Sequence, residues 1–453
     1  MAECKYKGCN GKAFEDSDYC ILHIEFPDNE DIEKLQKIVY YKLKAVQEKV
    51  NKGDFNFAGV QLDEVDFSGN EIDHDVDFRN SKINGDVYFD HANISGIIDF
   101  RHSEIMGNFD CTELRSLMVH SPKIIHGDVS FELANLEFTL NLGDARILGS
   151  VNLYGLNCGE ICNLSNTKIY NDLDISSASI NLYAPFIDME VKGKSEFRNT
   201  QFKAGAIFNG AKFGDNVDFS EAQFYEYVKF DKTNFNENVN FYLTSFLSTG
   251  FFRDINEFNA EFEMARLKNI AFRNCDLSKT RFKHVIFENC ELSASKWKDE
   301  IPEYYDYKKG ELNALVVADT YRRIRQCLQK EGAFNEAGEF YIKEMNMKRA
   351  SFKKKNKGLW ALYSLLLVTS NYGESLKRII FSFIAIISIF TGIYYLKFNF
   401  ELSNALSFSA INSIALIYNQ PANGLEWVIF AERLIGTFLT AVIIYTFTRK
   451  LSR

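Results

Sequence analysis

The stretch that decides the fold is residues 202–246, which read FKAGAIFNGAKFGDNVDFSEAQFYEYVKFDKTNFNENVNFYLTSF. From Phe202 to Phe246 a phenylalanine recurs without a miss, at steps that alternate between six and five residues. An α-helix buries a residue every 3.6 positions and a flat strand every second one, so neither explains this period. The spacing predicts a chain that turns a corner after each short side, and such a self-similar run indicates a solenoid.

The same apolar ladder extends in both directions. It runs backwards from Phe197 to Phe131 and reappears between Phe57 and Cys111. Only about residues 112–124 lose the register, which predicts either one irregular coil or an extruded loop. Towards the C-terminus the period tightens to a strict five between Leu267 and Trp297, where a small or β-branched residue usually stands two places earlier.

These residues resemble a pentapeptide-repeat protein, whose unit has a small residue two places before a Leu or Phe and polar residues between. The resemblance covers about residues 55–297. It implies a right-handed quadrilateral β-helix of about eleven coils with roughly 20–22 residues each. Recurrent glycines suit corners that need a positive φ, because glycine has no Cβ to clash. They are Gly85, Gly96, Gly107, Gly127, Gly149 and Gly193.

The predicted fold class is therefore a mainly β solenoid, followed by a helical linker and a C-terminal α-helical transmembrane hairpin. The expected domains are a zinc-knuckle-like N-terminus at 1–27, a capping helix at 28–52, the β-helix at 53–300, a cytoplasmic helical hairpin at 301–357, an interfacial helix at 358–376 and a two-transmembrane pore-loop domain at 377–453. Charge divides along the same lines. Residues 51–300 hold 39 acidic and 24 basic residues (net −15), whereas residues 301–453 hold 12 and 20 (net +8).

The N-terminus holds four soft metal ligands, Cys4, Cys9, Cys20 and His23. The first twelve residues are polar and charged, unlike a signal peptide, so we expect a reducing compartment in which clustered cysteines bind metal more often than they form disulfides. A closed Cys3His set predicts a structural zinc ion. The alternative is a loose tail with free thiols.

Beyond Trp297 the period becomes helical, over 312–330 and 334–354, and ends in a cluster of Lys and Arg between Lys348 and Lys357. Such a cluster anchors a chain to anionic lipid or binds nucleic acid. The residues that follow favour lipid. Leu359 to Val368 is an apolar ten-residue run with Trp360 and Tyr363 at its start, which predicts an interfacial helix.

Two candidate transmembrane helices follow, at 379–396 and 425–447. Basic residues precede the first and follow the second, which predicts a multi-pass protein of the cell membrane with both termini in the cytoplasm. Between them, the uncharged segment 404–421 is too short to cross. Such a segment is tolerated at membrane depth only where protein or a water-filled cavity covers it.

Here the residues resemble the two-transmembrane pore-loop channels of the potassium-channel superfamily. Leu406, Phe408 to Ala410 and Pro421 match the family's pore-helix start and post-filter proline, and Gly436 stands where the inner helix often has a hinge glycine. The resemblance implies a homotetramer with a permeating ion. The implied pore and filter residues are Asn412, Ser413, Ile414, Ala415, Leu416, Ile417, Tyr418 and Asn419.

The filter departs from the family's pattern because both of its glycines are replaced by bulkier residues. Potassium selectivity depends on backbone carbonyls that replace the hydration shell, so we expect a different selectivity or no conduction. Glu432 and Arg433 lie inside the second candidate span. Intramembrane charges are functional candidates, and these two pair with each other, pair with a neighbouring subunit or stay solvated near the outer end.

Two functions fit this sequence, and a third fits less well. The first is an oligomeric ion channel with a cytoplasmic β-helix for gating or sensing. The second is a membrane-anchored scaffold whose acidic solenoid binds a cytoplasmic protein or ligand. The third, a soluble DNA-mimicking topoisomerase inhibitor, is disfavoured by the membrane hairpin, and we expect no nucleic-acid partner. No catalytic residue pattern stands out, so we do not expect an enzyme.

Overall fold

The computed structural model describes residues 2–27, 31–414 and 425–451. It divides into two compact units, residues 1–302 and 303–453. The first unit holds helix α1 (Ile32–Val50) and the strands of the solenoid. The second holds the seven described helices α2 to α8, of which α2 begins at Pro302, the last residue of the first unit. Their bounds are α2 (Pro302–Lys309), α3 (Ala314–Glu331), α4 (Phe334–Lys355), α5 (Lys357–Ser370), α6 (Leu376–Phe398), α7 (Leu402–Ile414) and α8 (Glu426–Leu451).

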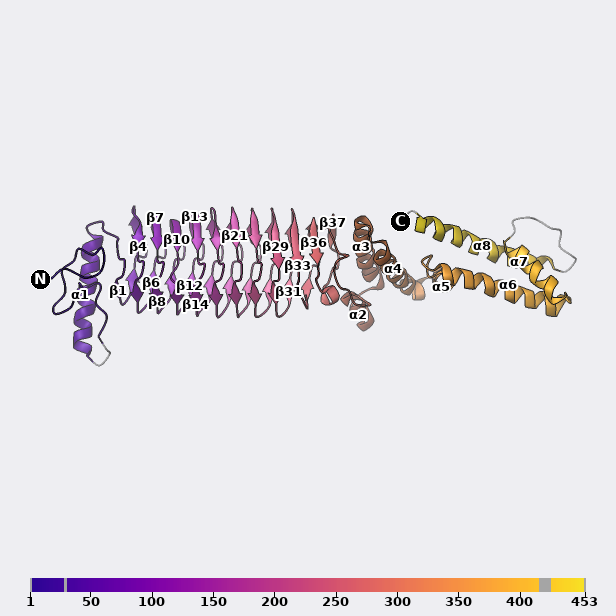
Figure 1. The fold of residues 1–453 in the computed structure, drawn as a ribbon, viewed down its shortest axis with the longest axis horizontal. Coiled ribbons are helices and arrows are strands. Elements are labelled where there is room, and N and C mark those ends of the chain that lie inside the picture. Colours follow the sequence, from indigo (N-terminus) through magenta and orange to yellow (C-terminus); the bar gives the residue numbers. More distant parts are fainter. Residues whose placement is uncertain (1, 28–30, 415–424, 452–453) are drawn as a thin grey trace. The chain divides into compact units, whose positions relative to one another are not determined.

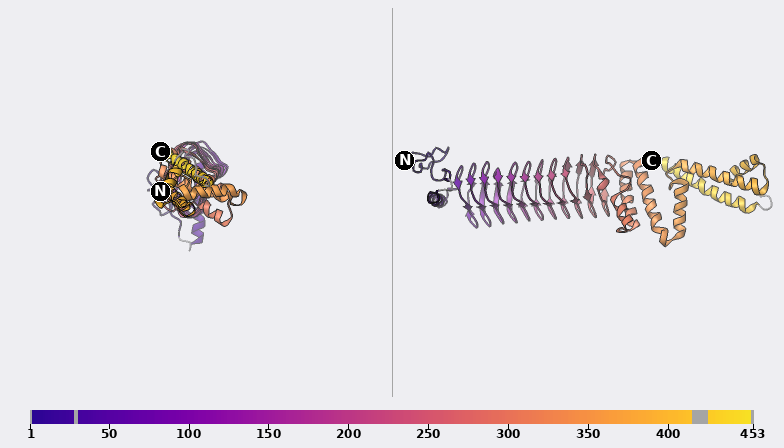
Figure 2. Two further views of the ribbon diagram at one scale, coloured as in Figure 1. Left: turned by 90° about the vertical axis from the view of Figure 1, so that its right-hand side faces the viewer. Right: turned by 90° about the horizontal axis from the view of Figure 1, so that it is seen from below.

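The solenoid is built from short parallel strands stacked coil upon coil (Figure 1). In the described part of the chain they form sheets of 9, 13, 10 and 5 strands. The sheets run from β1 (Gln61–Leu62) to β30 (Asn234–Phe235), from β3 (Glu71–Ile72) to β37 (Ile286–Glu288), from β2 (Val65–Asp66) to β34 (Ala260–Glu261) and from β21 (Tyr183–Pro185) to β36 (Ile270–Arg273). The predicted β-helix is therefore confirmed, and Figure 2 shows its coils edge-on.

Coil length follows the spacing of the ladder. Where the steps alternate six and five, strands pair with a 22-residue offset, as between Lys168 and Glu190. Where the step is a strict five, the offset falls to 20, as between Arg266 and Ile286. Two steps of six and two of five, or four steps of five, thus close one coil.

The ladder residues point inward and stack in columns. Phe208 is fully buried and stacks on Phe230, with ring centroids 4.7 Å apart and planes 6° from parallel. Phe219 and Phe241 repeat the arrangement at 5.1 Å and 6°. Burying a phenylalanine contributes about 1.5–3 kcal/mol, so the columns dominate the stability of the solenoid.

The prediction that the recurrent glycines take a positive φ is wrong. In the described solenoid the positive φ recurs at other positions, mostly every eleven residues and with a longer step across the irregular coil between Glu113 and Leu133, in a turn of the type II pattern. These positions include Asn80, His91, His102, Glu113, Leu133, Asp144, Gly155, Asn166, Ser177 and Leu243. The glycines are required for a different reason, since a Cβ on Gly107 would lie 2.6 Å from the Gly85 carbonyl carbon. Neighbouring coils approach too closely there for any side chain.

Residues 112–124 form an irregular coil and not an extruded loop. Strand β10 (Arg115–His120) pairs with β7 (Asn93–Asp99) on one side and β13 (Asn135–Asn141) on the other, with a bulge between Ser116 and Met118. The coil is two residues short, because Glu104 pairs with Ile124 at an offset of 20 instead of 22. The missing residues explain the lost register.

In the second unit α3 and α4 form an antiparallel pair, as the helical period predicts. Helix α3 ends at Gly332, which has a φ of +85° and lets the chain reverse. The Glu344 carboxylate on α4 is buried and accepts from Arg325 on α3 at 2.8 Å and from Lys348 at 2.6 Å. Paired in this way, a buried carboxylate fixes the register of the two helices.

Candidate functional site

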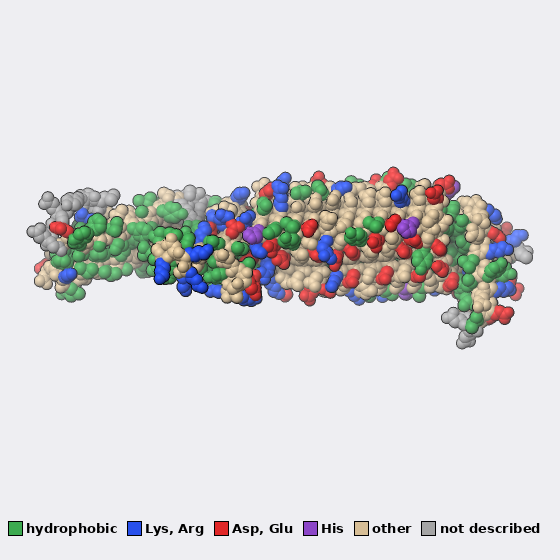
Figure 3. Space-filling model, turned by 180° about the vertical axis from the view of Figure 1, so that it is seen from behind, with side chains coloured by type: hydrophobic (Ala, Val, Ile, Leu, Met, Phe, Trp, Pro, Cys, Tyr) green, Lys and Arg blue, Asp and Glu red, His purple; other side chains and the backbone are tan. Residues whose placement is uncertain are grey.

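Two helices of the second unit are long and apolar enough to cross a membrane, over Leu376–Phe398 and Glu426–Thr448. In each helix only 22% of the most apolar 18-residue stretch is buried, whereas the core helix of a soluble protein would be mostly buried. Their outer faces expose large apolar side chains, such as Phe381 at 69% and Trp427 at 82%. Figure 3 shows this part of the surface as largely hydrophobic. An apolar surface of this extent is a place for lipid or further subunits.

Helix α7 packs against both long helices. Phe390 and Tyr394 of α6, Ala405 of α7, and Leu425 and Ile429 at the start of α8 form one buried cluster. Thirteen residues of helix span about 20 Å, less than the ~30 Å of a bilayer core. Helix α7 is therefore held inside the hairpin without the length to cross a membrane.

The Glu432 carboxylate is the centre of a buried polar network that joins all three helices. It is fully buried and accepts three hydrogen bonds. Tyr394 of α6 donates its hydroxyl at 2.6 Å, and Ser409 and Ser413 of α7 donate theirs at 2.5 and 3.0 Å. Three donors satisfy most of the carboxylate's capacity, which offsets the cost of burying it.

Arg433 faces a different partner from its neighbour in sequence. Its Nε and Nη2 atoms donate to Asn412 Oδ1 at 3.2 and 2.9 Å. The predicted alternatives for Glu432 and Arg433 did not include α7, yet both side chains hydrogen-bond to it. Asn412 is buried, and its Nδ2 atom has no hydrogen-bond partner among the described residues.

Gly436 lies one turn further along α8, against the backbone of α7. A Cβ on this residue would stand 2.2 Å from the Ser413 carbonyl oxygen. The helix continues unbroken through it to Leu451. In this structure the glycine is a point of close helix approach.

The predicted filter is only partly described. Asn412 and Ser413 are buried in the network, and Ile414 at the end of α7 is 66% exposed. Ala415, Leu416, Ile417, Tyr418 and Asn419 lie outside the described residues.

Sequence reasoning missed two members of the network. Tyr394 hydrogen-bonds to a residue 38 positions away, and Ser409 was noted only as a family match. A signal was present, because a buried tyrosine in an apolar span needs a partner for its hydroxyl. The sequence did not indicate that this partner is Glu432, because the two residues are 38 positions apart.

Ahead of α6, helix α5 combines an apolar surface with nearby positive charge. Leu362, Leu365 and Val368 are 44, 49 and 71% exposed. Lys353, Lys354, Lys355 and Lys357 precede them and are also exposed. The end of α5 is fixed to α6, since Arg378 donates to the Leu367 carbonyl at 3.2 Å and Ser382 to that of Thr369 at 3.1 Å.

At the other end of the chain, the structure brings the four predicted metal ligands together. The ligand atoms of Cys4, Cys9, Cys20 and His23 all lie within 4.8 Å of one another. Burial raises the pKa of the Cys9 thiol to about 12. Burial acts on Cys4 in the same direction, but hydrogen bonds from the backbone of Cys20 and Tyr6 and from the Cys9 and Cys20 thiols together lower the Cys4 pKa to about 7.

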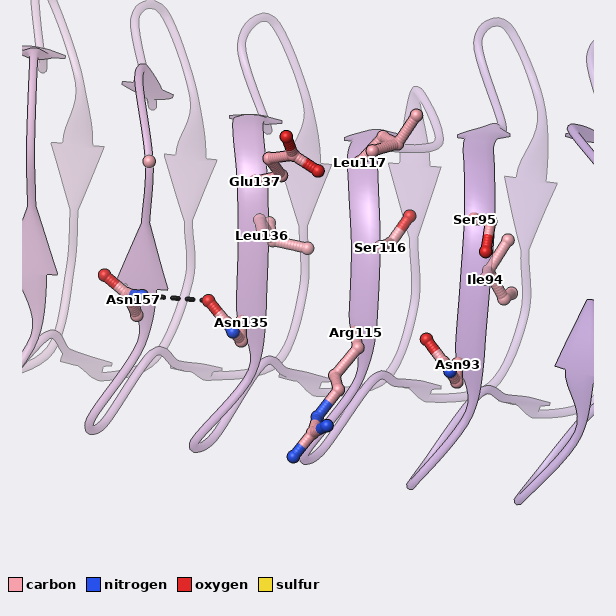
Figure 4. A pocket seen from close by; sticks show the side chains of 11 residues that line it. Asn93, Ile94, Ser95, Arg115, Ser116, Leu117, Asn135, Leu136, Glu137 and Asn157 are labelled. Carbon is pink, nitrogen blue, oxygen red and sulfur yellow. Dashed lines mark hydrogen bonds between the residues drawn. The ribbon is translucent and has the colours of Figure 1, made fainter. Parts of the chain in front are cut away.

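The irregular coil creates a shallow groove of about 510 Å³ on the solenoid (Figure 4). Its floor is a row of residues in register, Asn93, Arg115, Asn135 and Asn157. The Asn157 amide donates to Asn135 at 2.8 Å. The groove offers amide and guanidinium groups to a polar ligand or a peptide backbone.

Comparison with protein families finds pentapeptide repeats in two stretches of the solenoid. One family, pentapeptide repeats (9 copies), matches residues 186–233 and 197–245, and another, pentapeptide repeats (8 copies), matches 258–295. Among solved structures the chain is similar to HetL, a pentapeptide repeat protein involved in heterocyst differentiation regulation from the cyanobacterium Nostoc sp. strain PCC 7120. That similarity has 14% identity, covers 55% of this chain and 94% of HetL, and has a TM-score of 0.20. No curated protein sequence matches this chain. The family matches show that this chain carries pentapeptide repeats over residues 186–245 and 258–295, within the ladder of parallel coils.

Proposed function

We propose that the C-terminal hairpin forms the pore of an oligomeric ion channel of the two-transmembrane pore-loop type, and that the pentapeptide-repeat domain gates it or senses for it. The observation that carries the proposal is the position of α7. A helix too short to cross is packed between two membrane-length helices and hydrogen-bonded to both of them. A hairpin that only tethers a protein to the membrane requires no such helix.

The Glu432 network supports the proposal because a charged side chain in a bilayer costs free energy, and such residues in membrane helices mark functional sites. By the helix rise, Glu432 lies about 9 Å along α8 from its start. Satisfied by three donors from two other helices, its carboxylate positions α7 and does not line the pore.

A pore of this type needs more than one chain. Two helices and a loop cannot enclose a conducting path, and the exposed apolar faces of α6 and α8 provide surface for neighbouring subunits as well as lipid. The resemblance to the superfamily implies four subunits. The replaced filter glycines imply a selectivity other than that of potassium channels.

The proposed location is the cell membrane, with the pentapeptide-repeat domain in the cytoplasm. The exposed lysines before α5 suit an anionic inner leaflet, and the exposed leucines of α5 suit its interface. Lys377 and Arg378 at the start of α6 follow the same positive-inside pattern.

A second candidate is a membrane-anchored scaffold. The observation that favours it is the polar groove of the acidic solenoid, whose row of asparagines and Arg115 suits a bound peptide or polar ligand. In that case the hairpin would hold the solenoid at the membrane and pass no ion.

Ion flux into proteoliposomes that contain the purified full chain distinguishes the ion channel from the scaffold. The channel proposal predicts flux down gradients of small ions, reduced at least tenfold in the double variant Ser409→Ala and Ser413→Ala. The matched control is Ser388→Ala, because that exposed hydroxyl bonds only within its own helix and the variant should behave as wild type. A well-folded oligomer that passes no cation or anion at any imposed voltage would support the scaffold instead.

A further inference from the structure

The N-terminal cysteines and histidine have the geometry of a tetrahedral site. Cys9 Sγ lies 3.7 Å from Cys20 Sγ, and His23 Nδ1 lies 3.6 Å from Cys4 Sγ and 3.0 Å from Cys20 Sγ. A tetrahedral zinc ion with bonds of about 2.3 Å to sulfur and 2.0 Å to nitrogen places its ligands about 3.5–3.8 Å apart. Two of these three separations fall in that range, and all four ligand atoms lie within 4.8 Å of one another, so the cluster has the size that a zinc ion requires. All three cysteines are free thiols.

Hydrogen bonds with the surrounding backbone reach three of the four ligands, Cys4, Cys9 and His23. The backbone N–H groups of Gly11 and Cys20 donate to Cys9 Sγ at 3.3 Å and to Cys4 Sγ at 3.2 Å. Such bonds stabilise thiolates. His23 Nε2 donates to the Ala58 carbonyl at 3.0 Å, which leaves Nδ1 as the lone-pair nitrogen that faces the sulfurs.

The same outer contacts join the cluster to the first coil of the solenoid. The His23 ring stacks on Tyr6 at 4.2 Å, and Tyr6 in turn lies against Gly59, where a Cβ would be 2.0 Å from its ring. The Leu22 carbonyl accepts from the N–H of Gln61, the first residue of β1, at 2.7 Å. Residues 22 and 23 thus cover the open edge of the first strand, a place where unpaired backbone invites wrong association.

We propose that Cys4, Cys9, Cys20 and His23 bind one zinc ion, and that this ion fastens the N-terminal segment onto the first coil as a clasp. The metal holds His23 in place, and His23 holds Ala58 through its other ring nitrogen. The clasp is independent of ion conduction, because every residue in it belongs to the first unit.

Metal content of the purified full-length protein tests the proposal. We expect one zinc per chain, lost in the variants Cys20→Ser and His23→Ala. The matched control is Cys275→Ser, because the Cys275 thiol donates to the Phe252 carbonyl at 3.2 Å in the same way that the Thr280 hydroxyl donates to that of Phe258 at 2.8 Å. It should keep its zinc.

A second measurement on the unmodified chain holds even if the variants fold poorly. Cobalt exchanged into the site should give the intense visible bands of a tetrahedral ion and thiolate charge-transfer bands. Chelation should speed amide hydrogen exchange at Gly59 and Gln61 at least tenfold and leave residues 202–246 unchanged. Sub-stoichiometric zinc with no cobalt bands, or exchange at Gly59 that ignores chelation, would overturn the proposal.

Discussion

The solenoid and the hairpin bury their side chains in opposite ways. In the solenoid one apolar contact is repeated from coil to coil, so that the ring centroids of Phe186 and Phe208 lie 4.9 Å apart and those of Phe208 and Phe230 lie 4.7 Å apart. In the hairpin the position of α7 depends on a few contacts that occur once, centred on Glu432. A repeated contact gives stability that survives local damage, whereas a single contact gives a specific geometry that one substitution removes.

The largest expected effect is in the solenoid. Phe208→Ala should cost about 3–5 kcal/mol, because it leaves a cavity in a fully packed column. Because coils contact only their neighbours, faster hydrogen exchange should be confined to the adjacent coils. Denaturant unfolding checks the energy. The control Tyr225→Ala, at a 40% exposed position, should change stability by less than about 0.5 kcal/mol. Faster hydrogen exchange along the entire solenoid would contradict the view that damage stays local in repeated coils.

The next effect concerns the hairpin. Glu432→Ala leaves the hydroxyls of Tyr394 and Ser413 without their acceptor and leaves Ser409 only the Ile387 carbonyl, at a cost of about 3 kcal/mol. Thermal unfolding in detergent and proteolysis of α7 are the measurements. The exposed Glu426 in the first turn of the same helix gives the control, Glu426→Ala, which should be near neutral. Equal behaviour of the two variants would show that the network does not hold α7.

Gly436→Ala tests the close approach of α7 and α8 by adding a single methyl group. The added Cβ would overlap the Ser413 carbonyl, and displacing α7 should cost about 1–3 kcal/mol. Gly392 of α6 is the natural counterpart, because a Cβ there meets nothing within 4 Å. Gly392→Ala should be neutral or stabilising. Hydrogen exchange of α7 distinguishes them, and protection retained in Gly436→Ala would contradict the close approach.

The smallest expected effect on stability is at the corners of the solenoid. Leu243 has a φ of 54°, a conformation that costs most residues about 1–2 kcal/mol, so Leu243→Gly should raise stability by up to about 1 kcal/mol. Leu182 is similarly exposed but not in the left-handed region, so Leu182→Gly should lower stability by about 0.5–1 kcal/mol. Denaturant midpoints check the opposite signs. The same sign for both would argue that the corners are not strained.

The fold could be predicted because each coil repeats the same physical constraint. The spacing from Phe202 to Phe246 fixes a 22-residue coil, and the strict five after Leu267 fixes a 20-residue one. The role of the glycines could not be read in this way. A small residue suits both a left-handed corner and a close backbone approach, and the true corners accept residues as different as Asn80 and Leu133.

The candidate site was predictable only where its residues are close in sequence or chemically unusual. Cys4, Cys9, Cys20 and His23 lie within twenty residues, and the structure brings their ligand atoms together. Glu432 and Arg433 stand out as charges in an apolar span. Their partners do not, because the contacts to Tyr394 and Asn412 arise from helix packing and have no periodic signature.

Single-channel recording in a planar bilayer tests the central claim most directly. The full-length protein should give unitary currents, and the variant Asn412→Ala with Tyr418→Ala should change their conductance or reversal potential. The control Leu434→Ala alters a 62% exposed side chain of α8 and should leave both quantities unchanged. Currents that are the same in all three proteins, or no current from a folded oligomer under several ions and voltages, would contradict a pore built around α7.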